Sequence, residues 1–67
     1  MIIQLNGKSI QLAETICTVE DLLHSYQLEN RIVVVEVNKE ILYPELYGTT
    51  VLSNGDIVEL IHFVGGG

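Results

Sequence analysis

Hydrophobic and polar residues alternate at the start of the chain, in the segment MIIQLNGKSIQL at residues 1–12. An alternation with a period of two is typical of a strand with one buried face. Asn6-Gly7 interrupts it, and this dipeptide supplies the positive φ angles of a two-residue hairpin turn. The segment therefore predicts a β-hairpin, whose apolar face carries Met1, Ile3, Leu5, Ile10 and Leu12.

The period changes in the segment TVEDLLHSY, at residues 18–26. Thr18 is a favoured helix N-cap, and the acidic residues at positions 20 and 21 suit the positive end of a helix dipole. The apolar residues after the cap recur at the spacing i, i+3, i+4 and i+7. The segment therefore predicts a short amphipathic helix with a stripe of Val19, Leu22, Leu23 and Tyr26.

The second half of the chain predicts three more strands. Residues 32–37 are rich in β-branched side chains, residues 41–43 form a short strand that Pro44 ends, and residues 57–63 follow a tight turn at SNGD. The segment 45–53 between them is irregular, with one helical turn at residues 45–47. The predicted fold is α+β in the order β-β-α-β-β-β, a mixed sheet of about five strands with one main helix on one face.

Size and charge narrow the function. The chain has 67 residues, 48% of them hydrophobic, and a net charge of −6, so we expect one folded domain. Negative charge repels phosphate backbones, which argues against nucleic-acid binding and favours a partner with a basic docking face. No membrane span or secretion signal is evident, and the single cysteine can form no internal disulfide, so we expect a cytoplasmic protein.

The last residues read HFVGGG, a hydrophobic strand that runs into three glycines. Glycine is costly to order and packs no core, but it lets a backbone pass where a side chain would collide. We expect a domain at residues 1–64 followed by a flexible arm at residues 65–67, made of Gly65, Gly66 and Gly67. Extended, residues 64–67 reach about 14 Å at about 3.5 Å each, enough to enter the active site of another protein.

Several motifs together resemble the ubiquitin-like β-grasp sulfur carriers, and within them the carriers of thiamin biosynthesis. The motifs are QLNG at residues 4–7, VEVNKE at 35–40, NGDIVEL at 54–60 and the terminal Gly66-Gly67. The resemblance covers the whole chain, and Gly65 is the one departure, since it lengthens the arm by a residue.

The resemblance implies a co-substrate and not an enzyme. An E1-like adenylyltransferase would activate the carboxylate of Gly67 with ATP, and a persulfide donor such as a cysteine desulfurase would convert it to a thiocarboxylate. Thiazole synthase would then accept the sulfur. The carrier would bind no cofactor itself. Activation is chemically necessary, because a carboxylate is ionised at neutral pH and is a poor electrophile.

Two alternatives stay open at this point. The small subunit of molybdopterin synthase shares the fold, the terminus and the thiocarboxylate chemistry but serves another pathway. A β-grasp interaction module without sulfur chemistry would bind a partner through its sheet, and its function would survive truncation of the glycines.

Strand parity predicts a docking patch. If the mid-strand Glu36 and Glu59 face water, then every second residue beside them faces outward too. This phase places an apolar group on the open face of the sheet, close to the arm, where exposed apolar residues often mark a partner contact. The predicted patch consists of Ile2, Val34, Ile61 and Phe63.

The other reactive side chains predict little chemistry. His24 and His62 are far apart in sequence and have no ligand cluster at metal-binding spacing, so we expect no metal site and partly exposed histidines. Cys17 precedes the helix with no basic neighbour to activate it. We expect the sulfur to reside on Gly67 and not on Cys17.

Overall fold

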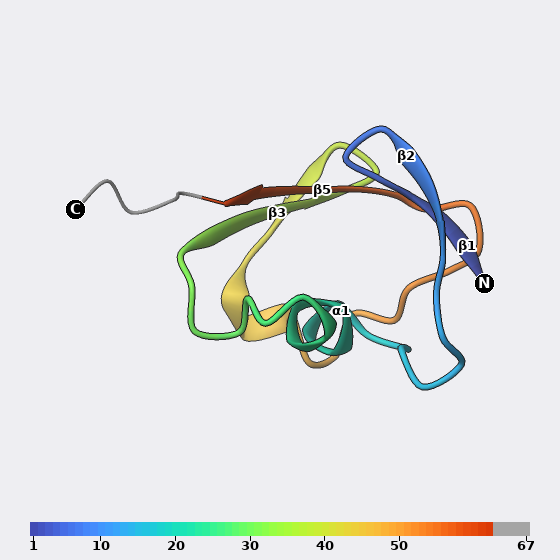
Figure 1. Cartoon of the computed structure of the whole chain (residues 1–67). Helices are drawn as coiled ribbons and strands as arrows, with labels where there is room; N and C mark the ends of the chain where they lie inside the picture. The colour runs from blue at the N-terminus through green and yellow to red at the C-terminus, as the bar shows by residue number, and fades with distance from the viewer. Residues whose placement is uncertain (63–67) are drawn as a thin grey trace.

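The structure is a computed structural model, and it describes residues 1–62. One helix lies under a curved sheet (Figure 1). No helix of the described part is long and apolar enough to cross a membrane. In chain order the elements are β1 (Ile2–Leu5), β2 (Lys8–Gln11), α1 (Val19–Ser25), β3 (Val33–Val37), β4 (Glu40–Leu42), the 3-10 turn η1 (Pro44–Leu46) and β5 (Ile57–His62).

The last strand lies in the middle of the sheet. The strand order is β2-β1-β5-β3-β4. β5 runs parallel to β1, with Gln4 beside Ile57, and antiparallel to β3, with Val33 beside His62. Antiparallel hairpins complete both edges, β1 with β2 and β3 with β4. The expected mixed sheet of five strands with one helix is therefore confirmed.

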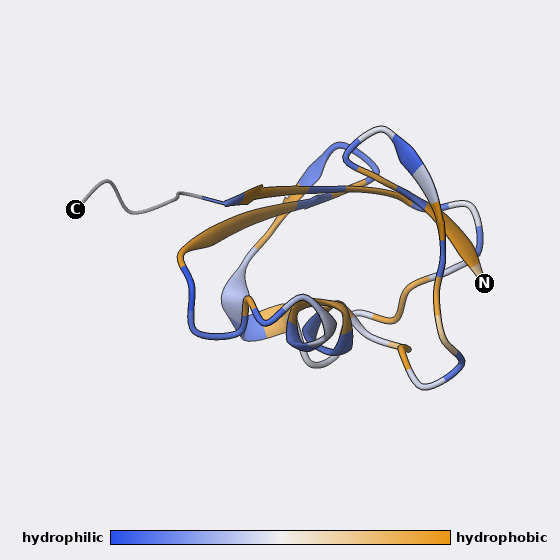
Figure 2. Ribbon diagram, in the orientation of Figure 1, coloured by the Kyte–Doolittle hydropathy of each residue, from blue (hydrophilic) through white to orange (hydrophobic). Residues whose placement is uncertain are grey.

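The core fills the space between the sheet and α1. Hydrophobic residues follow β1, β3 and β5, whereas the hairpin tips and the loop after α1 are hydrophilic (Figure 2). The inward parity predicted for the strands is confirmed, since Val35 and Val58 are fully buried and Val33 and Val37 pack against the core. The buried residues are Ile3, Leu5, Leu12, Val19, Leu22, Leu23, Val35, Leu52, Val58 and Leu60.

The start of α1 is fixed by a capping box. The Thr18 hydroxyl accepts a hydrogen bond from the backbone N–H of Asp21 (3.1 Å), and the Asp21 carboxylate accepts one from the N–H of Thr18 (3.1 Å). The same carboxylate accepts from the N–H of Cys17 (3.0 Å). These bonds, first from Cys17 and then from Thr18, hold the pKa of Asp21 below its ordinary value. The predicted cap at Thr18 is confirmed.

The irregular segment between η1 and β5 packs against the start of α1. The N–H of Val19 donates to the carbonyl of Thr50 (3.1 Å), and that of Glu20 to the carbonyl of Tyr47 (3.0 Å). Leu52 from this segment enters the core. The first N–H groups of a helix have no partner inside it, so the segment satisfies donors that the helix leaves open.

Several predicted boundaries were wrong by one residue. Asn38 and Lys39 both have positive φ (51° and 72°) and form a two-residue turn without glycine. β4 therefore begins at Glu40, and Tyr43 already precedes η1. Ile32 is 78% exposed and lies outside β3. The predicted helical turn at residues 45–47 is confirmed but lies at 44–46, because proline suits the first position of a helix.

Two apolar residues predicted on buried faces are exposed. Tyr26 was assigned to the helix stripe, but α1 ends at Ser25, and Tyr26 is the C-cap with 45% of its surface exposed. Met1 precedes β1 and is 38% exposed. Each lies just outside its element, so the periodic pattern that buries the residues inside the element does not bury these two.

Candidate functional site

The candidate site begins where β5 ends, because β5 is the strand that leads toward the C-terminus. Its last residue, His62, is paired with Val33 at the start of β3. The predicted arm, with Gly65, Gly66 and the proposed reactive Gly67, lies outside the described residues, as do the predicted domain limit at residue 64 and Phe63. The described part of the site is therefore β5 with its neighbours.

Three asparagine side chains bond the backbone of the two central strands, two of them on β5 and one on β1. Asn6 Oδ1 accepts from the N–H of Leu60 (2.8 Å), beyond the point where β1 stops pairing with β5. Asn38 Oδ1 accepts from the N–H of Ile57 (2.9 Å), and Asn54 Oδ1 accepts from the N–H of Ile2 (2.8 Å) on the neighbouring strand. Each bond satisfies a backbone donor that the sheet ladder leaves open.

The sequence interpretation missed this function of the asparagines. It read Asn6 and Asn54 only as turn residues, and Asn6 and Asn38 do have positive φ in hairpin turns. The available signal was their position inside the motifs QLNG, VEVNKE and NGD, which carry the resemblance. These motifs thus hold the strand that leads to the C-terminal glycines.

Two of the predicted patch residues lie side by side on the open face of the sheet, the face turned away from α1. Val34 on β3 and Ile61 on β5 are direct cross-strand partners. Ile61 is 45% exposed and Val34 is half-buried. Their strand neighbours Val35 and Leu60 are buried, which confirms the outward parity predicted for both.

Ile2 lies on the same face of the sheet but far from the Val34–Ile61 pair. It is 48% exposed, so its outward orientation is as predicted. However, β1 is parallel to β5 with Gln4 beside Ile57, which sets Ile2 six positions before Ile61 along the strands. That offset is roughly 20 Å at about 3.3 Å per residue. The structure therefore separates Ile2 from the Val34–Ile61 pair, and the single patch that we predicted was wrong in this respect.

The irregular segment 45–53 does not cover the open face. It packs on the helix side of the sheet, where Thr18 and Val51 form an isolated β-bridge and the N–H of Leu52 donates to the carbonyl of Cys17 (2.8 Å). Figure 1 shows this segment beside α1, below the sheet. The Val34–Ile61 pair therefore stays accessible to a partner.

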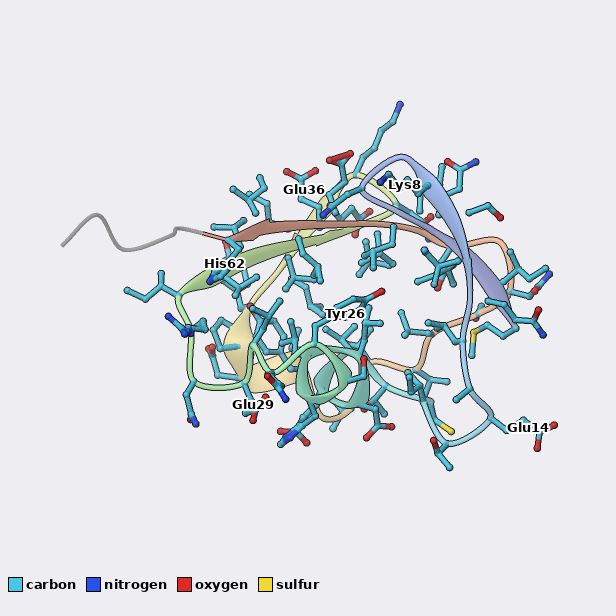
Figure 3. The ribbon with its side chains drawn as sticks, viewed as in Figure 1. Lys8, Glu14, Tyr26, Glu29, Glu36 and His62 are labelled. Carbon is cyan, nitrogen blue, oxygen red and sulfur yellow. The ribbon has the colours of Figure 1, made fainter. Side chains whose placement is uncertain are left out.

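His62 is more enclosed than the sequence suggested. Its side chain lies on the helix side of β5, opposite to Glu36 (Figure 3), in the inward phase set by Val58 and Leu60. The residue is half-buried, and its Nε2 is buried with no hydrogen-bond partner among the described residues. An unsatisfied buried nitrogen destabilises a fold. The residue is thus partly exposed, as predicted, but the sequence did not show that its Nε2 is enclosed.

The remaining candidates form no catalytic group in residues 1–62. His24 is exposed, and its Nδ1 lies 4.0 Å from Glu29 Oε2. Cys17 is a free, exposed thiol whose Sγ lies 3.8 Å from the carbonyl oxygen of Glu14. Among the described residues, no three His, Cys, Asp or Glu side chains gather in a group that could hold a metal ion.

Tyr47 ties the loop after η1 to the β3 end of the site. Its hydroxyl donates to the carbonyl of Val33 (3.4 Å), the residue paired with His62. Burial raises the pKa of Tyr47, and the nearby carboxylate of Glu45 raises it further. The phenol is therefore protonated and able to donate at neutral pH.

The fold and the site first define a class, the small ubiquitin-like β-grasp proteins. The crystal structure of a thiamine biosynthesis protein (ThiS) from Geobacter metallireducens superposes with a TM-score of 0.82 at 33% identity, over 100% of both chains. An NMR structure of a thiamine biosynthesis protein from the same organism gives the same TM-score and identity and is covered over 88% of its length.

The particular family follows from the sequence comparison. The model of the ThiS family matches residues 3–67. The sulfur carrier protein ThiS of Bacillus subtilis (strain 168) is 52% identical over 65 residues, which are 97% of this chain and 98% of that protein. The chain therefore belongs to the ThiS family.

A second relative is a much longer protein. The thiazole synthase of Magnetococcus marinus is 40% identical over 67 residues, which are 100% of this chain but 20% of that protein. A segment similar to this whole chain is thus part of a thiazole synthase.

Proposed function

We propose that this chain is a sulfur carrier of thiamin biosynthesis that works as a co-substrate. An E1-like adenylyltransferase uses ATP to convert the carboxylate of Gly67 to an acyl-adenylate, with pyrophosphate as the leaving group. The terminal sulfur of a persulfide donor, such as a cysteine desulfurase, then displaces AMP and forms an acyl disulfide. A second thiol breaks the S–S bond of this intermediate, which releases the thiocarboxylate and leaves a disulfide between the two thiols. Thiazole synthase takes the sulfur from it.

The observation that carries this proposal is the identity of 52% to the Bacillus subtilis sulfur carrier over nearly the full length of both proteins. The family match extends to residue 67, so it includes the glycines. The match to a thiazole synthase favours the thiamin pathway over the molybdopterin alternative.

The chemistry explains why the arm ends in glycines. The reacting carboxylate must enter an active site on another protein, and glycine adds no side chain that would meet the walls of a narrow channel. β5 supplies a firm base, because it lies between β1 and β3 and is fastened by Asn6 and Asn38. We therefore assign Gly67 as the modified residue and Gly65 and Gly66 as the arm.

The test is intact-mass analysis after incubation with adenylyltransferase, ATP, a persulfide donor and a thiol reductant. Wild type should gain the mass of one oxygen-to-sulfur exchange, located at Gly67 by fragmentation. Deletion of Gly67 should abolish this gain, because the new carboxylate stops roughly 3.5 Å short. Gly66→Ala should fold normally but form the thiocarboxylate about 10²-fold more slowly, the effect of a misplaced reacting group.

The matched control is Cys17→Ser, which should keep the rate of wild type. Sulfur recovered on Cys17, or full activity of the Gly67 deletion, would overturn the proposal in favour of a thiol carrier or an interaction module. Thiocarboxylate that transfers sulfur to molybdopterin synthase and not to thiazole synthase would favour the other pathway.

A further inference from the structure

Two carboxylates face each other on the open side of the sheet. Glu36 on β3 and Glu59 on β5 are direct cross-strand partners. Their neighbours Val35, Val58 and Leu60 are buried, so both glutamates point away from α1. Figure 3 shows Glu36 on this outer side. Direct partners on adjacent strands have Cβ atoms about 5 Å apart, so the two side chains start from neighbouring positions on this face.

No cation of the described residues neutralises this pair. Within residues 1–62, the ion pair that comes within 4.0 Å is His24–Glu29, which involves neither carboxylate. Like charges directly opposite each other on a sheet destabilise it. The net charge of −6 adds to the repulsion. The free domain therefore holds two like charges at paired positions, with no ion-pair partner within 4.0 Å among the described residues.

The carboxylates lie between apolar side chains. On the same face, the next cross-strand pair toward His62 is Val34–Ile61. Toward the edge of the sheet, Glu36 is paired with Ile41 of β4, which is 58% exposed. We call this surface the acidic–apolar face; it consists of Val34, Glu36, Ile41, Glu59 and Ile61.

We propose that the acidic–apolar face binds a partner protein through an arginine side chain placed between Glu36 and Glu59. A guanidinium is planar and has five N–H donors, so it can bond two carboxylates at once. Its weak hydration suits a site that the surrounding apolar side chains dry on contact. A bound divalent ion is the weaker occupant, because the described residues bring no third acidic, cysteine or histidine ligand to a metal group.

This inference rests on the proposed function, since the partner is one of the enzymes that act on Gly67. The acidic–apolar face includes Ile61, the residue before His62, at the end of β5 that leads toward the glycines. An enzyme that grips this face controls the direction from which the arm arrives. The arginine would also neutralise the two like charges. The glutamates should therefore strengthen partner binding but lower the stability of the free domain.

This can be tested with Glu36→Gln, Glu59→Gln and the double variant, which should be more stable than wild type but bind the partner enzyme more weakly. Removal of the repulsion should raise the melting temperature of the free domain by about 1–4 °C. The KM for the carrier as substrate of the adenylyltransferase or of thiazole synthase should rise about tenfold for each single variant, while kcat changes little. The salt dependence of binding should be weaker in the double variant than in wild type.

Glu14→Gln is the matched control. It removes the same charge from the loop before α1, far from Glu36 in Figure 3, and should leave KM within about twofold of wild type, as expected for a peripheral charge. An equal rise in KM with Glu14→Gln would show that only the net charge of the carrier matters, and it would overturn the proposal. So would a double variant with the KM of wild type toward both enzymes.

Direct titration of each purified enzyme with the carrier separates this inference from the proposed function. If wild type gains no sulfur, the proposed function fails, while the titration still decides the face. Weaker binding of both glutamate variants supports the arginine contact, and equal binding of all variants overturns it.

Discussion

The two faces of the sheet are built from the same strands but have different surroundings. On the inner face Val35, Val58 and Leu60 are buried against α1 and the loop beside it. On the outer face their immediate neighbours Glu59 and Ile61 are exposed. Successive residues of β5 thus alternate between the core and the solvent.

The difference separates stability from recognition within one strand. The inner residues exclude water and hold the fold, whereas the outer residues lose less water on folding and include a pair of like charges. A substitution one position away along β5 should therefore change a different property. The following four variants test this, from the largest expected effect on the free energy of unfolding to the smallest.

Leu60→Ala should have the largest effect. It removes buried side-chain volume from the core, and substitutions of this kind cost about 2–5 kcal/mol. Chemical denaturation monitored by circular dichroism measures the loss. Below the midpoint of unfolding, the folded fraction should still bind the partner enzymes. A loss of less than about 1 kcal/mol would show that β5 contributes little to the core.

Thr18→Ala should cost about 1 kcal/mol, the usual value of a lost N-cap. The substitution removes the acceptor for the N–H of Asp21 and leaves the sheet untouched. It therefore weakens the start of α1, which packs on the inner face of the sheet, without changing any strand. Thr18→Ser, which keeps a hydroxyl, is the control and should restore most of the stability.

Asp21→Asn should destabilise less and in a pH-dependent way. The pKa of Asp21 is lowered in the fold by the N–H groups of Cys17 and Thr18, so its stabilisation is present above the unfolded pKa near 3.9 and disappears as the pH falls through the folded pKa. Melting temperatures should differ at neutral pH and converge as the pH falls below the ordinary pKa of aspartate and through the lowered folded pKa. A constant difference over this range would contradict the role of the carboxylate charge.

Ile61→Asp should leave the free energy of unfolding within about 1 kcal/mol of wild type, since the side chain is exposed and loses only its contact with Val34. Partner binding should weaken at least about tenfold, because a charge would be buried without a counterion at the contact. Ile2→Asp, on the same face but at its other end, is the control. A large fall in stability with unchanged binding would show that Ile61 serves the fold and not partner recognition.

Much of this arrangement could be predicted from the sequence, because it follows from local patterns. The alternation around Asn6-Gly7 predicted the first hairpin, and the spacing from Val19 to Leu23 predicted the helix. The outward charges Glu36 and Glu59 set the correct phase for their strands. A period of two or 3.6 is a property of a short segment, and the sequence displays it directly.

The sequence failed where contacts between distant segments decide. It grouped Ile2 with Ile61, but the parallel register of β1 and β5 places them at opposite ends of the sheet. It read Asn6 as a turn residue, but the side chain also completes the ladder of β5, 54 positions further along the chain. Strand parity assigns a face, and only the register assigns a position on it.

The sequence by itself determined the order of the elements, the buried face of each strand and the family motifs that end in Gly66-Gly67. Only the tertiary structure decided that β5 is central, that Glu36 meets Glu59, and that the ring nitrogen of His62 is enclosed. The reason is physical. Periodicity comes from the local geometry of the backbone, whereas pairing depends on which of several apolar strands bury the most surface together against one helix.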